Sequence, residues 1–300
     1  MKRLVLFLKT YRGDLERTKI FKKSVDLYNK DLIPLFMIVP ESDLDLFEKE
    51  CRTHNEKYDL NILSDEIVLK ANNLPYTEQS WHSQQLIKLG FYKLNVCENY
   101  AIFDSDCYFI SPFYVSDFVS PDKVPYLAMK EENHEVLLTI KDYFKRQGKT
   151  YSFITPGQVF NSDLLSSFER KILQKKSWTW MDLIHISPYE FNWYGEYFLA
   201  SQELPLRPTK GLTKTFWDEM AYKRAQSLGL DIKDFIEQGY KALCIQNRWC
   251  HHLIYTPHRF YRFIKWKHNL FNKWNHPKIY RKNPFIHLFR FIKKARKISW

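Results

Sequence analysis

The sequence lacks several features that define whole classes of protein. Its five cysteines are odd in number and form neither a CxxC pair nor a repeated spacing, which argues against a disulfide framework or a zinc ribbon and predicts reduced thiols. No stretch reaches the roughly 20 uninterrupted apolar residues that a membrane-spanning helix needs. The start, MKRLVLFLKTYRGD, is basic, but its apolar run is short and no small-residue cleavage site follows. We therefore expect a buried strand there and not a signal peptide.

Acidic residues are missing from the last 43 positions. Residues 258–300 contain thirteen of the 46 Lys and Arg and no Asp or Glu. The remaining 33 cations nearly balance the 34 acidic residues, so the net charge of +12 belongs to this segment. We predict two parts, a neutral body at 1–257 and a basic aromatic tail at 258–300.

The body contains the short apolar runs expected of an α/β protein. Continuous runs, in place of strict alternation, are typical of strands buried on both faces of a sheet. They occupy residues 4–8, 35–39, 100–103 and 126–129, with 67–69 as a weaker candidate. Because a helical pattern separates the first two, the order predicts a mostly parallel sheet flanked by helices.

Two amphipathic helices are predicted in the first hundred residues. The first begins with Asp14 as its cap and repeats apolar residues among charged ones. These residues are Leu15, Ile20, Val25 and Leu27. The second covers about 79–95, and Leu86, Leu89 and Leu94 share one of its faces. Another face holds Trp81, Gln84, Gln85 and Lys88, which is unusual for plain solvent; an exposed side with one half-buried Trp is the alternative.

Asp104 and Asp106 follow the strand expected at 100–103. Ligands bind at the carboxyl ends of strands in open α/β sheets, and carboxylates at i and i+2 can converge on a hard cation such as Mg²⁺ or Mn²⁺. Such an ion would neutralise a diphosphate leaving group. Asp and Ser are also common turn formers, so a polar turn is the other interpretation.

Three segments resemble a family of bacterial glycosyltransferase-like proteins with the GT-A fold. They are SWHSQQLIKLGFYKLNVCENYAIFDSDCYFISPF, TYRGDLERTKIFKKSVDLYN and SPYEFNWYGEYF. Family members pair a Trp-x-x-Gln-Gln-x-x-Lys-Leu helix with an Asp-Ser-Asp sequence after the next strand, and the resemblance covers roughly 1–255. It implies a GT-A-like catalytic domain and a nucleotide-sugar-dependent transferase acting on a surface glycan such as lipopolysaccharide or capsule.

The resemblance also implies roles for individual residues. Asp104 and Asp106 are expected to bind Mn²⁺ or Mg²⁺ and the donor diphosphate. Lys88 would offset a phosphate charge, with a solvated lysine as the alternative. Further donor contacts are implied for Tyr11, Arg12, Asp14 and Gln85. For the three residues after the first strand, a helix cap with an exposed arginine is an equal alternative.

Glu190, in SPYEFNWYGEYF, matches a glutamate of the same family and is the expected general base. Its aromatic neighbours would raise its pKa, as a base needs, although such side chains also stack on sugars or pack in a core. Glu196 and Asp163 are lesser candidates. A third metal ligand is expected from His252, or else His251, in NRWCHHLIY, against the alternative of an ordinary surface or core histidine.

The tail interleaves its cations with aromatic residues at helical spacing. Phe285, Leu288, Phe289 and Ile292 follow i, i+3, i+4 and i+7, as on a helix. Basic amphipathic helices of this kind lie in anionic membrane interfaces, while a partner protein and single-stranded nucleic acid are the alternatives. No nucleic-acid module is recognisable in the body, so we expect no nucleic-acid partner.

Together these observations predict a glycosyltransferase that moves a sugar from a nucleotide sugar to a lipid-linked saccharide. We expect it in the cytoplasm, held on the inner face of the cytoplasmic membrane. A nucleotidyltransferase is the enzymatic alternative, but KTYRGDLER has one glycine where that class usually has a Gly-rich loop. A non-enzymatic protein that binds nucleic acid or membrane is the third hypothesis.

Overall fold

The computed structural model describes residues 1–75, 81–217 and 219–246. They belong to one unit, Met1–Asn247. The predicted boundary after residue 257, the basic tail 258–300 and the candidate ligands His251 and His252 lie outside the described residues, so these stay predictions. Within the described ranges, no helix is both long and apolar enough to cross a membrane.

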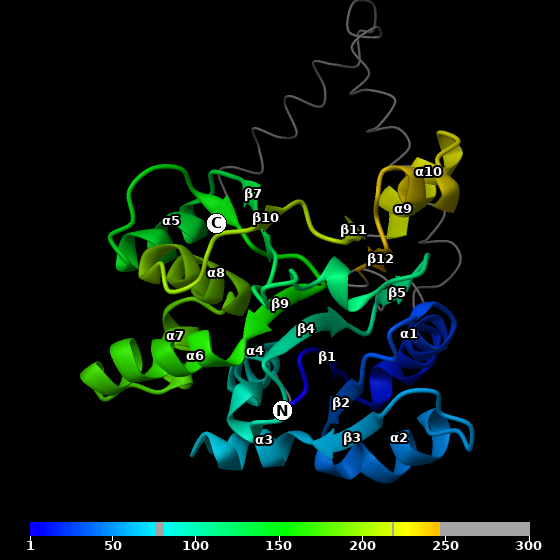
Figure 1. Ribbon diagram of the computed structural model, residues 1–300, viewed down its shortest axis with the longest axis horizontal. Coiled ribbons are helices and arrows are strands. Elements are labelled where there is room, and N and C mark those ends of the chain that lie inside the picture. The colour runs from blue at the N-terminus through cyan, green and yellow to red at the C-terminus, as the bar shows by residue number, and fades with distance from the viewer. Residues whose placement is uncertain (76–80, 218, 247–300) are drawn as a thin grey trace, which may run out of the picture. The chain divides into compact units, whose positions relative to one another are not determined.

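A five-stranded sheet forms the centre of the fold (Figure 1). Its strands are β1 (Val5–Lys9), β2 (Leu35–Val39), β3 (Leu60–Ser64), β4 (Asn99–Asp104) and β9 (Gln158–Asn161). Their order is β3-β2-β1-β4-β9. Neighbours run parallel except for β9, which is antiparallel to β4. This mostly parallel sheet, flanked by helices, confirms the predicted α/β fold class.

One of the predicted strands is wrong, and another is present but shorter than predicted. Residues 67–69 lie inside α3 (Asp65–Ala71), which begins where the Ser64 hydroxyl accepts the backbone N–H of Glu66. An apolar triplet is compatible with one helical turn as well as with a short strand. The N-cap hydrogen bond of Ser64 stabilises the helix here. Residues 126–129 contribute only β6 (Leu127–Ala128), which pairs with β10 (Pro208–Thr209) outside the central sheet.

Alternate side chains of β1 enter two separate apolar layers. Val5 and Phe7 belong to one, and Leu6 and Leu8 to the other. The first layer also contains residues of α3, α4 (Trp81–Gly90), α5 (Glu135–Tyr143), α6 (Ser162–Phe168), α7 (Trp180–Ile186) and α8 (Glu190–Ser201). The second contains residues of α1 (Leu15–Tyr28), α2 (Leu44–Cys51), β5 (Cys107–Phe109) and β12 (Ala242–Ile245). The sheet is therefore covered on both faces, as continuous apolar strands require.

A smaller sheet extends from the end of β4 through β5. Its order is β11-β12-β5, with β11 at Thr213–Phe216. It packs with α9 (Glu219–Ser227) and α10 (Ile232–Glu237) around Phe216, Phe235 and Leu243. The remaining pair is β7 (Lys130–Glu131) with β8 (Tyr151–Ser152). Short 3-10 or π segments are η1 (Arg12–Asp14), η2 (Glu41–Asp43), η3 (Phe91–Leu94), η4 (Val115–Asp117), η5 (Glu169–Leu173) and η6 (Gln174–Lys176).

Helix α1 is present and Val25 is buried as predicted, but two of the predicted apolar residues are exposed. Ile20 and Leu27 are 56% and 59% exposed, whereas Phe21 is fully buried. The Phe21 ring lies 5.5 Å from that of Phe103 on β4, measured between centroids. Asp14 occupies the N-cap position without a side-chain cap hydrogen bond. Burial of this large aromatic ring, together with Val25, therefore accounts for the rotation of the helix.

Helix α4 is shorter than predicted and is buried on both faces. It ends at Gly90 and continues as η3 to Leu94, where Asn95 adopts a left-handed conformation with φ of 53°. Leu86 and Leu89 are buried as expected, but Lys88 on the polar face is buried as well. The alternative of a solvent-exposed polar face is therefore wrong at Lys88. The polar face of α4 contributes to a charged cluster within the protein.

Candidate active site

The carboxyl ends of β1 and β4 lie side by side at the point where the strand order reverses. From β1 the chain moves outward to β2 and β3, and then returns to place β4 on the other side of β1. In the parallel register, Lys9 is opposite Asp104. Such a switch point opens a crevice beyond the strand ends, where α/β proteins bind ligands. The candidate site consists of the loops and helix ends around this crevice.

Asp104, Lys88 and Glu190 form a charged triad at this position. The Nζ atom of Lys88 on α4 lies 3.0 Å from Asp104 Oδ1 and 3.0 Å from Glu190 Oε1. Glu190 is the first residue of α8, so three elements meet at one ammonium group. The side chains of Lys88 and Glu190 are 4% and 5% exposed, whereas that of Asp104 is 33% exposed. The triad is thus open to solvent on the Asp104 side.

The two carboxylates favour the charged form of Lys88 despite its burial. Burial alone would lower the pKa of Lys88, but Asp104 and Glu190 raise it above its ordinary value. Burial raises the pKa of Glu190, and the negative charge of Asp104 adds to this effect while Lys88 opposes it. Two carboxylates facing one ammonium leave a net negative charge at the crevice, which favours a cation there.

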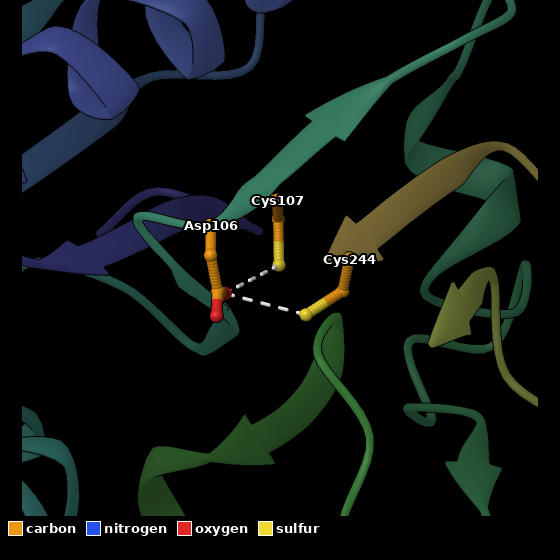
Figure 2. Close-up of side chains that lie close together, drawn as sticks. All are labelled: Asp106, Cys107 and Cys244. Atoms are coloured by element: carbon orange, nitrogen blue, oxygen red, sulfur yellow. Dashed lines mark hydrogen bonds between the residues drawn. The ribbon is translucent and has the colours of Figure 1, made fainter. Parts of the chain in front are cut away.

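Asp106 lies in a different environment from Asp104. Its Oδ1 atom accepts the thiols of Cys107, at 3.8 Å, and of Cys244, at 3.3 Å (Figure 2). Burial, together with the charge of Asp104, raises the pKa of Asp106 to about 6. Burial raises the pKa of the Cys107 thiol as well, and that of Cys244 lies well above its ordinary value because of its thiol neighbour and burial. Both sulfurs therefore carry protons and act as donors.

The two aspartates each keep one carboxylate oxygen available for a hard cation. Among the described residues, no hydrogen bond or ion pair uses Asp104 Oδ2 or Asp106 Oδ2. Two carboxylate oxygens suit Mg²⁺ or Mn²⁺, which take oxygen ligands and complete their shells with water and substrate phosphates. In the described part of the chain, however, the three groups close enough to share one ion are Asp106, Cys107 and Cys244. Asp104 is not among them.

The loop after β1 is joined to the aspartates by a hydrogen bond. Ser105, between the two aspartates, donates its hydroxyl to Asp14 Oδ2 at 2.7 Å. Asp14 therefore braces the two loops and does not cap α1 through its side chain, which corrects the capping prediction. Tyr11 is partly exposed at the same loop, and burial with the charge of Asp14 raises its pKa.

Arg12 is held by a partner that the sequence did not reveal. Its Nε donates to Asp43 Oδ1 at 2.6 Å and its backbone N–H donates to Asp43 Oδ2 at 2.8 Å. Nearby, Lys9 at the end of β1 donates to Asp65 Oδ2 at 3.1 Å in a buried pair. The sequence could have indicated Lys9 as a functional candidate, because it is a charged residue directly after a fully apolar run. Asp43 and Asp65 had no comparable signal in the sequence.

The remaining predicted residues make contacts other than those of the triad. Gln85 donates its amide to the Trp81 carbonyl at 3.0 Å, and its buried Oε1 accepts no hydrogen bond among the described residues. Glu196 is buried with Arg146, whose guanidinium donates to both carboxylate oxygens. Asp163 is exposed in the first turn of α6. Of the three base candidates, Glu190 is the one ion-paired to the lysine that also holds Asp104.

The fold and the site define an α/β protein with a cluster of charged residues at the switch point of its sheet. The chain belongs to the family described as "Family of unknown function (DUF6492)", whose model matches residues 3–236. Among solved structures it matches mouse xyloside xylosyltransferase 1 in the apo form, at 10% sequence identity and a TM-score of 0.43. That match covers 80% of this chain and 97% of the other. No curated protein sequence matches this chain.

Proposed function

We propose that this protein is a metal-dependent glycosyltransferase that uses a nucleotide-sugar donor. The observation that carries the proposal is the triad of Asp104, Lys88 and Glu190 beside Asp106 at the switch point of the sheet. It supplies an acidic edge for a divalent cation and a buried carboxylate for proton transfer within one crevice. The divalent cation would neutralise a nucleotide diphosphate leaving group. The buried carboxylate would accept a proton from an acceptor hydroxyl.

Asp104 and Asp106 would hold Mn²⁺ or Mg²⁺ through their available oxygens. When bound, the ion neutralises the negative charge of the departing diphosphate. Lys88 fixes the other Asp104 oxygen at 3.0 Å, and the two thiols fix the other Asp106 oxygen. Each carboxylate is therefore oriented before a ligand arrives, which reduces the ordering that binding requires.

Glu190 is the proposed general base. Burial raises its pKa, which makes it a stronger base than an exposed glutamate, while the ion pair with Lys88 favours its ionised form. It would accept the proton of the acceptor hydroxyl as that oxygen attacks the sugar. Phe191, the next residue, lies with its ring 5.0 Å from Lys88 Nζ, so apolar surface excludes water from this side of the ion pair.

The loop after β1 is the proposed nucleoside end of the site. Tyr11 and Asp14 lie in the segment directly after β1, and the hydrogen bond from Ser105 to Asp14 connects this segment to the two aspartates. The guanidinium of Arg12 is 61% exposed in the side chain although one edge is paired with Asp43. It therefore retains donors for a phosphate or a ribose hydroxyl.

The acceptor is proposed to be a lipid-linked saccharide, with the protein on the cytoplasmic face of the membrane. The support for this part is the basic aromatic sequence 258–300, because such segments bind anionic interfaces. Deleting it should prevent cosedimentation with anionic liposomes and leave cosedimentation with neutral liposomes unchanged. Equal sedimentation of the deleted and full-length proteins would remove this part of the proposal.

A donor screen tests the proposed function. Thermal unfolding is followed with UDP-, GDP-, CMP- and TDP-sugars, each with and without Mn²⁺. One nucleotide class should raise the unfolding temperature in a Mn²⁺-dependent manner, because a ligand that binds only the native state stabilises it. Asp104→Asn should abolish that shift, while the exposed Asp163→Asn should retain it. A shift unaffected by Mn²⁺ and by Asp104→Asn would contradict the proposal.

A further inference from the structure

Three potential metal ligands converge where the small sheet joins β4. Cys107 follows Asp106 directly and begins β5, while Cys244 lies on β12. In the antiparallel register, Cys244 is directly opposite Cys107. The turn after β4 brings the Asp106 carboxylate against both sulfurs (Figure 2). Residues 138 positions apart thereby form one cluster.

The spacing of the three ligand atoms fits a tetrahedral zinc ion. Zn–S bonds of about 2.3 Å and Zn–O bonds of about 2.0 Å at tetrahedral angles place a sulfur and an oxygen about 3.5 Å apart. Here Asp106 Oδ1 lies 3.3 Å from Cys244 Sγ and 3.8 Å from Cys107 Sγ. All three ligand atoms lie within 4.8 Å of one another. Only a small adjustment is needed to close them on one ion.

The chemistry of the three ligands selects a soft cation. Two sulfurs and one carboxylate oxygen suit Zn²⁺, whereas Mg²⁺ and Ca²⁺ require oxygen shells. Three protein ligands leave a fourth position for water or another ligand, as in open zinc sites. We propose that Asp106, Cys107 and Cys244 bind Zn²⁺, at a site that shares Asp106 with the proposed Asp104 and Asp106 pair but takes its other two ligands from cysteines.

Zinc binding at this site is accompanied by the release of protons. Each thiol loses its proton to become a thiolate ligand, so one Zn²⁺ binds and two protons are released. Since Asp106 is shared, Zn²⁺ also competes with Mn²⁺ for this carboxylate, a consequence that rests on the proposed function. The zinc site itself does not, because Asp104 and Glu190 take no part in it.

Cobalt spectroscopy of the full-length protein, purified under reducing conditions, tests the site. Tetrahedral Co²⁺ bound to thiolates gives a charge-transfer band in the near ultraviolet, and Zn²⁺ but not Mg²⁺ should displace it. Cys107→Ser, Cys244→Ser and Asp106→Asn should each weaken Co²⁺ binding at least about 100-fold, since loss of an outer partner alone costs 10–100-fold. Asp106→Asn preserves side-chain shape, and far-ultraviolet circular dichroism confirms folding of each variant.

Matched variants separate this cluster from the other candidates. Cys51→Ser and Cys97→Ser change buried cysteines elsewhere, and Cys250→Ser changes the cysteine beside His251 and His252. All three should retain the band. Asp104→Asn should also retain it while losing donor binding, which distinguishes failure of this inference from failure of the proposed function. Absence of the band in the natural sequence, its persistence without Cys107 or Cys244, or its loss in Cys250→Ser would overturn the zinc site.

Discussion

Asp104 and Asp106 are two residues apart, yet the side chains that hold their carboxylates differ in charge and in chemistry. Asp104 is partly exposed and is held by a buried ammonium that also pairs with Glu190. Asp106 is held by two protonated thiols from β5 and β12. Neighbouring carboxylates with different partners can serve different chemistry. The difference shows that Asp-x-Asp in this chain joins a charged region and a thiol region, and each of the following predictions tests one of them.

The largest effect is expected from Glu190→Gln in the charged region. An amide of the same shape cannot accept a proton, so sugar transfer should fall by about 10²- to 10⁴-fold. Initial rates of nucleoside diphosphate release in the presence of acceptor provide the measurement. Asp163→Asn, an exposed change on α6, should stay within about twofold of the natural protein. Near-normal transfer in Glu190→Gln would remove Glu190 as the base.

The second largest effect is a loss of stability in the charged region when Lys88 is replaced. Lys88→Met leaves Asp104 and Glu190 facing each other without a cation, and this should lower the free energy of unfolding by about 3–5 kcal/mol. Lys149→Met removes an ion pair in which both side chains are exposed and should cost no more than about 1 kcal/mol. Urea unfolding compares the two. Adding Glu190→Gln to Lys88→Met should restore part of the loss, and equal losses in the two lysine variants would contradict a central role for the triad.

A smaller effect is expected in the thiol region. Cys244→Ala removes a buried sulfur and a thiol donor to Asp106, whereas Cys51→Ala removes a sulfur of similar burial without a carboxylate acceptor. The first variant should be less stable than the second by about 0.5–1.5 kcal/mol, the net value of one hydrogen bond. Chemical denaturation of both measures the difference. Identical stability would mean that the thiol contributes packing alone.

Local sequence patterns predicted the parts of this molecule that depend on neighbouring residues. The apolar runs located β1, β2 and β4, and the position of Asp104 at the carboxyl end of its strand followed directly. The short strand β9 and the alternating strand β3 were not predicted, because neither is a continuous apolar run. In α1, residues of similar hydrophobicity competed for one face, and burial of Phe21 against β4 decided the rotation. That choice depends on a strand some 80 positions away.

The pairing of residues within the candidate site could be seen only in the folded structure. Lys88 and Glu190 are 102 positions apart, and Asp106 and Cys244 are 138 apart. The resemblance indicated Lys88 and Glu190 separately, but neither spacing nor composition could pair them. Likewise, the resemblance indicated Arg12, whereas nothing in the sequence indicated its partner Asp43. Ion pairs and thiol contacts of this kind arise from strand order and helix packing, and local periodicity holds no information about either.

The most direct test of the central claim is the dependence of donor turnover on the two aspartates. Release of nucleoside diphosphate is measured with the donor found in the screen, at saturating Mn²⁺, for the natural protein and for Asp104→Asn and Asp106→Asn. The account predicts Mn²⁺-dependent release in the natural protein and at least a 100-fold loss in each variant with the fold retained, because each variant replaces a charged carboxylate ligand of the ion with a neutral amide. Full activity in either folded variant would contradict the assignment of these carboxylates as the metal and donor site.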